Sequence, residues 1–293
     1  MVPALDDLNF QVPSREVFGI LGPNGGGKTT LFRILATMLR PTAGSASVFD
    51  RDVTTESHQV RRELGVIFQT PSLDLKLTAK ENLHLHGQLY GLSGSGLKKR
   101  IAHWLDRFGL SSRRSERVER FSGGMRRRLE LAKTLLHEPR LLLMDEPSTG
   151  LDPGAQRDLW DSLEQLPDMS IALTTHLMNE ADRCDRLGVL SEGKMLAIDT
   201  PDNLKSRISG HVITVEPIGD PQSVAAQISK HFRTKTTIVD GTISWEQVDG
   251  AQTVAALGTT FGDRFHRITV AKPSLEDVFL QLTGHRFENQ WPC

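Results

Sequence analysis

The chain has 293 residues, enough for one large domain and a second, smaller one. Its 35 lysines and arginines balance 36 aspartates and glutamates, so no overall charge points to nucleic acid as a partner. Two cysteines are too few for a disulfide framework, and no apolar run approaches the ~18 residues of a membrane span. We therefore exclude a disulfide-stabilised secreted protein and expect any membrane role to come through a partner.

A glycine-rich segment lies near the N-terminus, between an apolar stretch and a helical pattern. The apolar stretch 17–21 predicts a buried strand, and apolar residues recur at helical spacing from Leu31 to Leu39, before Pro41. The segment between them fits G-x-x-x-x-G-K-[ST], in which backbone N–H groups and a helix N-terminus surround nucleotide phosphates. It consists of Gly22, Pro23, Asn24, Gly25, Gly26, Gly27, Lys28, Thr29 and Thr30.

Two side chains of this segment carry chemistry of their own. Lys28 would reach the β- and γ-phosphates, and Thr29 would offer a hydroxyl to Mg²⁺. The alternative is a flexible glycine turn that merely precedes a core helix.

A second glycine motif, Phe121–Met125, precedes another helical pattern. Apolar residues recur from Met125 to Leu136, and Ser122 stands close to the expected start of the helix. The segment Ser122, Gly123 and Gly124 would therefore present N–H groups to an anion. One phosphate loop suffices to bind one nucleotide. The second motif therefore suggests that this segment binds the nucleotide of another subunit.

The apolar run 141–144 leads directly to two acidic residues, Asp145 and Glu146. A buried strand here would deliver both carboxylates at its carboxyl end, where ligands of open α/β sheets bind. Asp145 would hold Mg²⁺ through water, and Glu146 would polarise the water that attacks the γ-phosphate. Two solvated acids at the end of a strand are the alternative.

The pattern changes after about residue 209. We expect strands near 212–215, 236–239, 242–245 and 266–270 and helices near 223–232, 253–261 and 274–282. Asp240-Gly241 is a hairpin signal between the second and third strands. The order β-α-β-β-α-β indicates a small ferredoxin-like domain, in which we find no catalytic constellation. Its role would be regulation or dimer contact.

In this order, the motifs resemble those of the nucleotide-binding subunit of ATP-binding-cassette (ABC) transporters. The resemblance runs from about Ala4 to about Asp199. Besides the phosphate loop and the two acids, it rests on Val66–Gln69, Phe121–Met125, Ser148–Asp152 and Thr174–His176. Within the family, Phe121–Leu129 and the terminal Pro273–Phe279 are similar to exporter ATPases of the daunorubicin-resistance type.

The resemblance implies an α/β fold of the P-loop NTPase class. The ABC ATPase domain would occupy residues 1–208, with a helical subdomain inserted at about 70–135. A small α+β domain would occupy residues 209–293. Two subunits would form a head-to-tail dimer, either of identical chains or with a closely related ATPase.

The resemblance also implies a role for each matched residue. The phosphate loop of one subunit and the Ser122 segment of the other would enclose each ATP. Gln69 would sense Mg²⁺ and the attacking water, so that Thr29, Gln69 and Asp145 would all lie at the metal. His176 would contact the γ-phosphate and help to orient the water, unless it is an ordinary structural histidine. Asp152 would touch the partner subunit, and it can at the same time precede a helix that starts at Pro153.

The family's activity is hydrolysis of ATP to ADP and phosphate, coupled to transport. By resemblance, a separate permease would export drugs, lipids or other hydrophobic or polymeric cargo. The subunit would lie in the cytoplasm against the membrane, with its helical subdomain on the permease. Leu73, Leu75 and Leu77 would make that contact or pack in the core. The rivals are an ABC ATPase without a permease, acting in translation or DNA repair, and a non-hydrolysing switch.

Two positions depart from the family pattern. Family members stack adenine on an aromatic residue ahead of the segment that matches 4–8, where only Met1, Val2 and Pro3 stand here. Either the start codon is placed too late, or the adenine base contributes ~1–3 kcal/mol less to the free energy of ATP binding. In the second case, selectivity for ATP over GTP would be weak. Met125 replaces the family's glutamine, but the backbone donors and Ser122 remain, so we expect the site to work.

Overall fold

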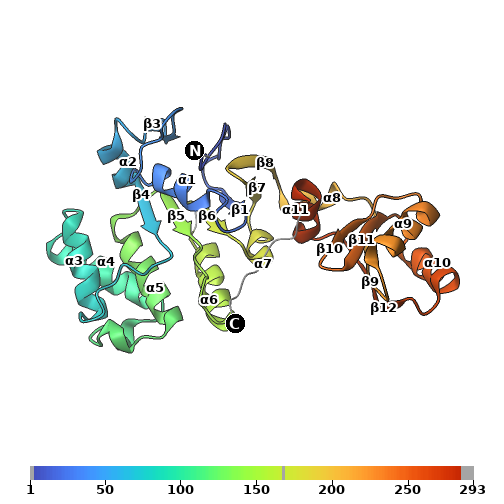
Figure 1. Ribbon diagram of the computed structural model, residues 1–293. Helices are drawn as coiled ribbons and strands as arrows, with labels where there is room; N and C mark the ends of the chain where they lie inside the picture. The colour runs from blue at the N-terminus through green and yellow to red at the C-terminus, as the bar shows by residue number, and fades with distance from the viewer. Residues whose placement is uncertain (1–2, 167–168, 285–293) are drawn as a thin grey trace. The chain divides into compact units, whose positions relative to one another are not determined.

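The computed structural model describes residues 3–166 and 169–284 (Figure 1). The chain divides into two compact units. The first comprises residues 1–20, 24–175 and 192–194, and the second comprises 21–23, 176–191 and 195–293. None of the helices in the described residues combines the length and the hydropathy needed to span a bilayer.

The first unit contains β1 (Val17–Leu21), β4 (Leu64–Ile67), β5 (Leu141–Asp145) and β6 (Ser170–Thr175), in the sheet order β4-β5-β6-β1. β5 runs parallel to both β4 and β6, with Leu142 opposite Gly65 and Ile171. Every residue of β6 is buried, as expected for a parallel strand covered on both faces. The predicted P-loop type of α/β fold is therefore confirmed in its central strands.

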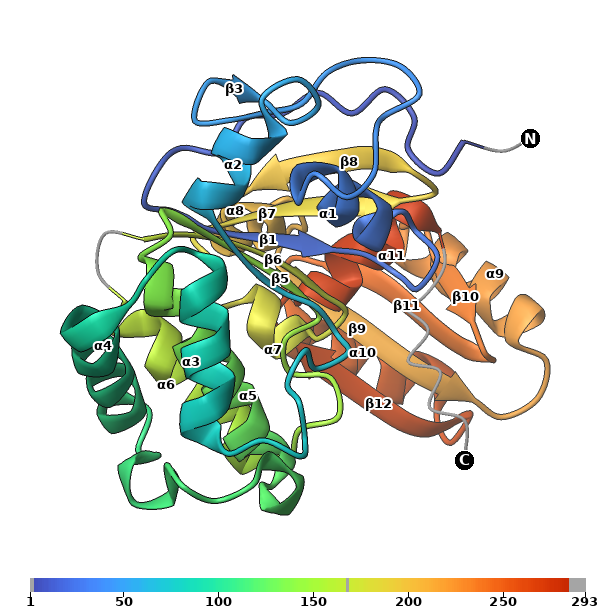
Figure 2. The same cartoon turned by 90° about the vertical axis from the view of Figure 1, so that its left-hand side faces the viewer.

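Helices cover both faces of these strands. Figure 2 shows α1 (Lys28–Leu35) on one side and α5 (Gly123–Thr134) and α6 (Pro153–Glu164) on the other. The unit also contains α2 (Ser57–Glu63), α3 (Ala79–Leu89), α4 (Gly94–Arg107), the hairpin of β2 (Ser47–Val48) and β3 (Arg51–Asp52), and the short turns η1 (Ser111–Arg113), η2 (Val118–Arg120) and η3 (Leu135–His137). α3, α4 and α5, which fall within the expected helical subdomain at about 70–135, contact one another.

The start of α3 illustrates how local sequence fixes these helices. Thr78 Oγ1 accepts a hydrogen bond from the Glu81 N–H at 3.2 Å, and Glu81 Oε2 accepts one from the Thr78 N–H at 2.8 Å. This reciprocal capping box satisfies two N–H groups that would otherwise lack partners at the helix start. The hydrogen bonds also hold the pKa of Glu81 below its ordinary value, so the carboxylate form makes the cap.

The helix after the glycine segment is shorter than the sequence predicts. α1 ends at Leu35 because Thr37 adopts a left-handed φ of 61°. The N–H groups of Met38 and Leu39 both turn back to the carbonyl oxygen of Arg33. Met38 and Leu39 are exposed, so their helical spacing does not mark a buried face.

The second unit contains a four-stranded antiparallel sheet in the order β10-β11-β9-β12. The unit begins with α7 (Met178–Ala181), β7 (Arg186–Ser191), β8 (Lys194–Asp199) and α8 (Pro201–Ser206). The part of the unit that contains the antiparallel sheet follows, with β9 (His211–Pro217), α9 (Pro221–Phe232), β10 (Thr237–Val239), β11 (Thr242–Gln247), α10 (Gly250–Phe261), β12 (Phe265–Ala271) and α11 (Leu275–Thr283). The predicted β-α-β-β-α-β order is confirmed. Asp240 and Gly241 both have positive φ, as a type I′ hairpin turn requires.

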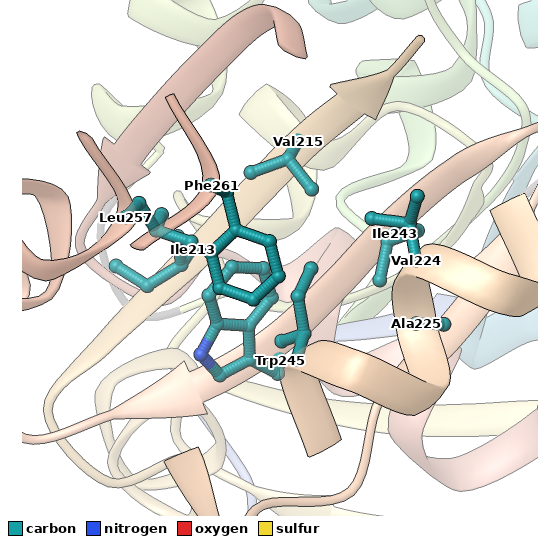
Figure 3. Packing of buried hydrophobic residues seen from close by; sticks show 9 residues of the cluster. Ile213, Val215, Val224, Ala225, Ile243, Trp245, Leu257 and Phe261 are labelled. Atoms are coloured by element: carbon teal, nitrogen blue, oxygen red, sulfur yellow. The ribbon is translucent and has the colours of Figure 1, made fainter. Parts of the chain in front are cut away.

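One face of this antiparallel sheet packs against α9 and α10 (Figure 3). Side chains alternate between the two faces of a strand, so Ile213 and Val215 face the helices from β9, as Ile243 and Trp245 do from β11. The helices contribute Val224, Ala225, Ile228, Leu257 and Phe261. These residues form the hydrophobic core between the antiparallel sheet and its two helices.

We expect Trp245→Ala to destabilise this core by ~3–5 kcal/mol, because the change removes a large buried side chain and leaves a cavity. The indole is buried and stacks on Phe232 at a centroid distance of 5.9 Å. Calorimetric unfolding of the full chain measures the effect. Val248→Ala, an exposed position near the end of the same strand, is the control. Equal unfolding temperatures for the two variants would contradict the expectation.

Candidate functional site

The glycine segment connects β1 to α1. Gly25 and Gly27 have φ values of 80° and 101°, which glycine adopts without strain. A Cβ atom on Gly27 would lie 2.5 Å from the carbonyl oxygen of Ala4, so glycine is needed here for space as well. The Gly193 N–H donates to the carbonyl oxygen of Gly26 at 3.1 Å and fixes the loop from a second side. Contacts from Ala4 and Gly193 therefore help to fix the shape of the loop.

Lys28, the first residue of α1, pairs with Glu146. Its Nζ lies 3.4 Å from Glu146 Oε1, and the two side chains are only 4% and 12% exposed. Burial lowers the pKa of Lys28 below its ordinary value, whereas the Glu146 and Asp145 carboxylates act in the opposite direction. The carboxylates of Asp145, the last residue of β5, and of Glu146, which follows it, therefore both act on the ammonium group of the phosphate-loop lysine.

Thr174 in β6 ties the two acidic residues together. Its Oγ1 donates to Asp145 Oδ1 at 2.6 Å and accepts from the Glu146 N–H at 2.9 Å. The Glu146 backbone is left-handed, with a φ of 48°, and Thr149 Oγ1 donates to Glu146 Oε2 at 3.2 Å. The sequence interpretation placed Thr174 in the motif before His176 but gave it no role of its own, although a threonine near the carboxyl end of a largely apolar strand was a signal for one.

The Ser122 segment forms the start of α5. Ser122 Oγ accepts from the backbone N–H three residues on, at 3.3 Å, so its expected place at the helix start is confirmed. A Cβ atom on Gly124 would lie 2.8 Å from Ala155 Cβ, because the starts of α5 and α6 approach closely. Asp152 caps α6 and accepts from the N–H groups two and three residues on, both at 3.0 Å. The structure thus places the Ser122 and Asp152 segments side by side.

Two predicted site residues have less defined surroundings. Gln69 follows β4 and is exposed, while the carbonyl oxygen of its neighbour Phe68 accepts from Arg127 Nη1 at 3.1 Å. His176 directly follows β6 and belongs to the second unit, whereas Lys28 and Glu146 belong to the first. The expected places of Gln69 and His176 beside the nucleotide therefore stay predictions.

The donor set fits a phosphate ester and a hard divalent cation. Thr29 supplies an exposed hydroxyl in the first turn of α1, and Asp145 supplies a carboxylate at the end of β5. Mg²⁺ prefers oxygen ligands, and it usually binds through one or two carboxylates plus substrate phosphates and waters. Within residues 3–166 and 169–284, no three His, Cys, Asp or Glu side chains gather as a metal cluster.

Comparison with known proteins agrees with this geometry. A family profile described as ABC transporter matches residues 5–149. The daunorubicin/doxorubicin resistance ATP-binding protein DrrA of Streptomyces peucetius is 39% identical over 294 residues, which cover 96% of this chain and 88% of that protein. The Nod factor export ATP-binding protein I of Rhizobium sp. (strain N33) is 40% identical, over 97% of this chain and 93% of that protein.

Solved structures show the same fold. An ATP-binding subunit of an ABC transporter matches with a TM-score of 0.63 and 31% identity, over 70% of this chain and 86% of that one. A dimeric ATP-binding cassette in a post-hydrolysis state, bound to ADP and phosphate, matches with a TM-score of 0.61 and 26% identity. That match covers 67% of this chain and 90% of the other. The chain therefore belongs to the ABC transporter family, among its ATP-binding proteins.

Proposed function

We propose that the chain is the ATP-hydrolysing subunit of an ABC exporter and drives a permease on a separate chain. The observation that carries the proposal is the buried pair of Lys28 and Glu146, which joins a phosphate loop to a carboxylate. Two relatives named for daunorubicin/doxorubicin resistance and for Nod factor export support export as the direction of transport.

In this proposal, the loop N–H groups and Lys28 bind the phosphates of ATP. Glu146 accepts the proton of the attacking water at its carboxylate, and its backbone is held by Thr174. Thr149 orients the carboxylate through its hydrogen bond to Oε2. Thr29 and Asp145 would hold Mg²⁺, with Gln69 beside it, and the ion supplies neutralisation of phosphate charge when bound.

We further propose that the site is completed by a second subunit. Ser122, Gly123 and Gly124 of that subunit would contact the γ-phosphate, since they form a helix N-terminus. Asp152 would lie at the subunit interface, and His176 would contact the γ-phosphate from the nucleotide's own subunit. The dimeric cassette among the similar structures supports this arrangement.

Coupling to the permease would pass through the helical subdomain, at the cytoplasmic face of the membrane. Of the three leucines considered for this contact, Leu73 is buried and Leu77 is half-buried, whereas Leu75 is exposed. Leu75 is therefore the candidate for contact with the permease, and Leu73 belongs to the core. We assign the ATPase to residues 1–208 and an accessory domain, for regulation or dimer contact, to residues 209–293.

Mixing two inactive variants tests the composite site. Lys28→Met disables the phosphate loop and Ser122→Arg blocks the opposite helix start, so we expect neither variant to hydrolyse ATP alone. In a head-to-tail dimer, half of randomly mixed dimers hold one intact site, and the mixture should regain up to about a quarter of wild-type phosphate release.

The control for this experiment mixes Lys28→Met with a second phosphate-loop variant, Gly27→Val. Both chains then lack the same half of the site, and no mixed dimer contains an intact one. A wild-type chain that hydrolyses ATP while the Lys28→Met and Ser122→Arg mixture stays inactive would rule out the shared site.

A further inference from the structure

Three charged side chains of α5 form a buried group apart from the phosphate loop, the α5 charge cluster. Arg127, Glu130 and Lys133 are spaced three residues apart, so they lie along one side of the helix. Arg127 Nη1 and Glu130 Oε2 are 3.0 Å apart, and these two side chains are 7% and 2% exposed. Charged side chains are rarely buried unless each is paired and hydrogen-bonded, so their contacts indicate a specific task.

Arg127 connects the two backbone segments that carry Gln69 and Glu146. Its Nε donates to the carbonyl oxygen of Pro147 at 2.7 Å, and its Nη1 donates to that of Phe68 at 3.1 Å. Pro147 directly follows Glu146, and Phe68 directly precedes Gln69. One planar guanidinium therefore binds both backbone segments and sets the distance between the segment that carries Glu146 and the segment that carries Gln69.

Glu130 and Lys133 fasten the other end of the Gln69 segment. Glu130 Oε1 accepts from the Ser72 N–H at 2.7 Å, and Lys133 Nζ donates to the Ser72 carbonyl oxygen at 2.8 Å. Burial lowers the pKa of Lys133 below its ordinary value, and Glu130 acts in the opposite direction. Residues 68 and 72 are thus both tied to α5, with Gln69 exposed between them.

We propose that Arg127 is a positioning residue that fixes Gln69 relative to Glu146, with Glu130 and Lys133 tying the Gln69 segment to α5. The inference rests on the proposed function, because it takes Glu146 as the base. α5 begins at the Ser122 segment, so an ATP held there by the partner subunit would act on the same rigid helix. A shift of α5 then moves the Gln69 and Glu146 segments together.

Arg127→Lys is the informative substitution, because lysine keeps the charge but loses the planar fork that serves two carbonyl groups. Arg126→Lys is the matched control: this neighbour donates to the carbonyl oxygen of Glu119, away from both segments. We measure kcat, the Kd of a fluorescent ATP analogue, and amide hydrogen exchange of residues 68–70, 72, 148 and 149.

We expect Arg127→Lys to lower kcat by about 10- to 100-fold, since small displacements of catalytic groups are costly. Nucleotide affinity should stay close to that of Arg126→Lys, because the phosphate loop is untouched. Exchange in both segments should become faster. Glu130→Gln, which removes the ion pair but keeps an acceptor for the Ser72 N–H, gives the same readouts if Arg127→Lys fails to fold.

Exchange rates equal to those of Arg126→Lys would overturn the inference, whether or not ATP is hydrolysed. Faster exchange with an unchanged kcat would overturn it too, because the cluster would then be merely structural. If the wild-type chain itself fails to hydrolyse ATP, the proposed function falls and the positioning role falls with it. Hydrogen exchange distinguishes the two failures, because it reports whether Arg127 anchors the two segments even when no ATP is hydrolysed.

Discussion

Glu146→Gln will bind ATP but hydrolyse it about 10²- to 10⁴-fold more slowly than the wild-type chain. Glutamine has the size of glutamate, so the backbone bonds to Thr174 and the shape of the site remain. Its amide cannot accept the proton of the attacking water. Phosphate release measures the rate, and size-exclusion chromatography with ATP should show the variant as a trapped dimer, since the proposed cycle reopens the dimer by hydrolysis.

The control is Glu216→Gln, which neutralises a glutamate on β9 of the second unit. Glu216 pairs with Arg267 at 3.4 Å near the protein surface, where such pairs contribute ~0–1 kcal/mol. We expect its turnover to match the wild type. Normal turnover in Glu146→Gln would remove Glu146 from the role of base.

Lys28→Met will weaken ATP binding by ~2–5 kcal/mol, the usual effect of truncating one member of a buried, hydrogen-bonded charge pair. This loss corresponds to a roughly 30- to 5,000-fold larger Kd. The methionine fills the volume of the lysine stem but offers no cation to the phosphates. Titration calorimetry measures the affinity, and the rise in unfolding temperature with added ATP, present in the wild type, should largely disappear.

Lys76→Met serves as the matched control for Lys28→Met. Lys76 lies on the surface, where its Nζ pairs with Glu119 Oε2 at 2.9 Å. Its loss should leave the ATP affinity unchanged and alter stability by less than ~1 kcal/mol. An ATP affinity of Lys28→Met equal to that of Lys76→Met would exclude Lys28 from phosphate binding.

Elements whose limits are set by neighbouring residues could be predicted from the sequence. The expected strand 17–21 coincides with β1, because a short apolar run between polar residues defines it. The hairpin at Asp240-Gly241 followed from turn chemistry alone. The end of α1 could not be predicted, because the spacing of Met38 and Leu39 does not reveal whether any surface covers them.

In the candidate site, too, some residues could be predicted from the sequence and others could not. The spacing of the motifs indicated that Lys28 and Glu146 converge, and the structure brings them to 3.4 Å. Arg127 lies in a run of three arginines, 126–128, and received no role from the sequence, because its partners Phe68 and Pro147 lie 59 and 20 residues away in the chain. A run of three arginines looks the same in a sequence whether one of them is buried or all are solvated. Long-range backbone contacts therefore limit what a motif can predict.

The left-handed backbone of Glu146 has a consequence for laboratory evolution. A residue with a Cβ pays ~1–3 kcal/mol in such a conformation, whereas glycine adopts it freely and asparagine tolerates it better. Substitution by either residue relieves that strain while removing the carboxylate. The same carboxylate pairs with the buried Lys28 ammonium, however, and removing one member of a buried pair costs about 3–5 kcal/mol, more than the strain relieved. A screen of this chain for heat resistance alone would therefore retain glutamate at position 146, so stability and turnover select the same residue there.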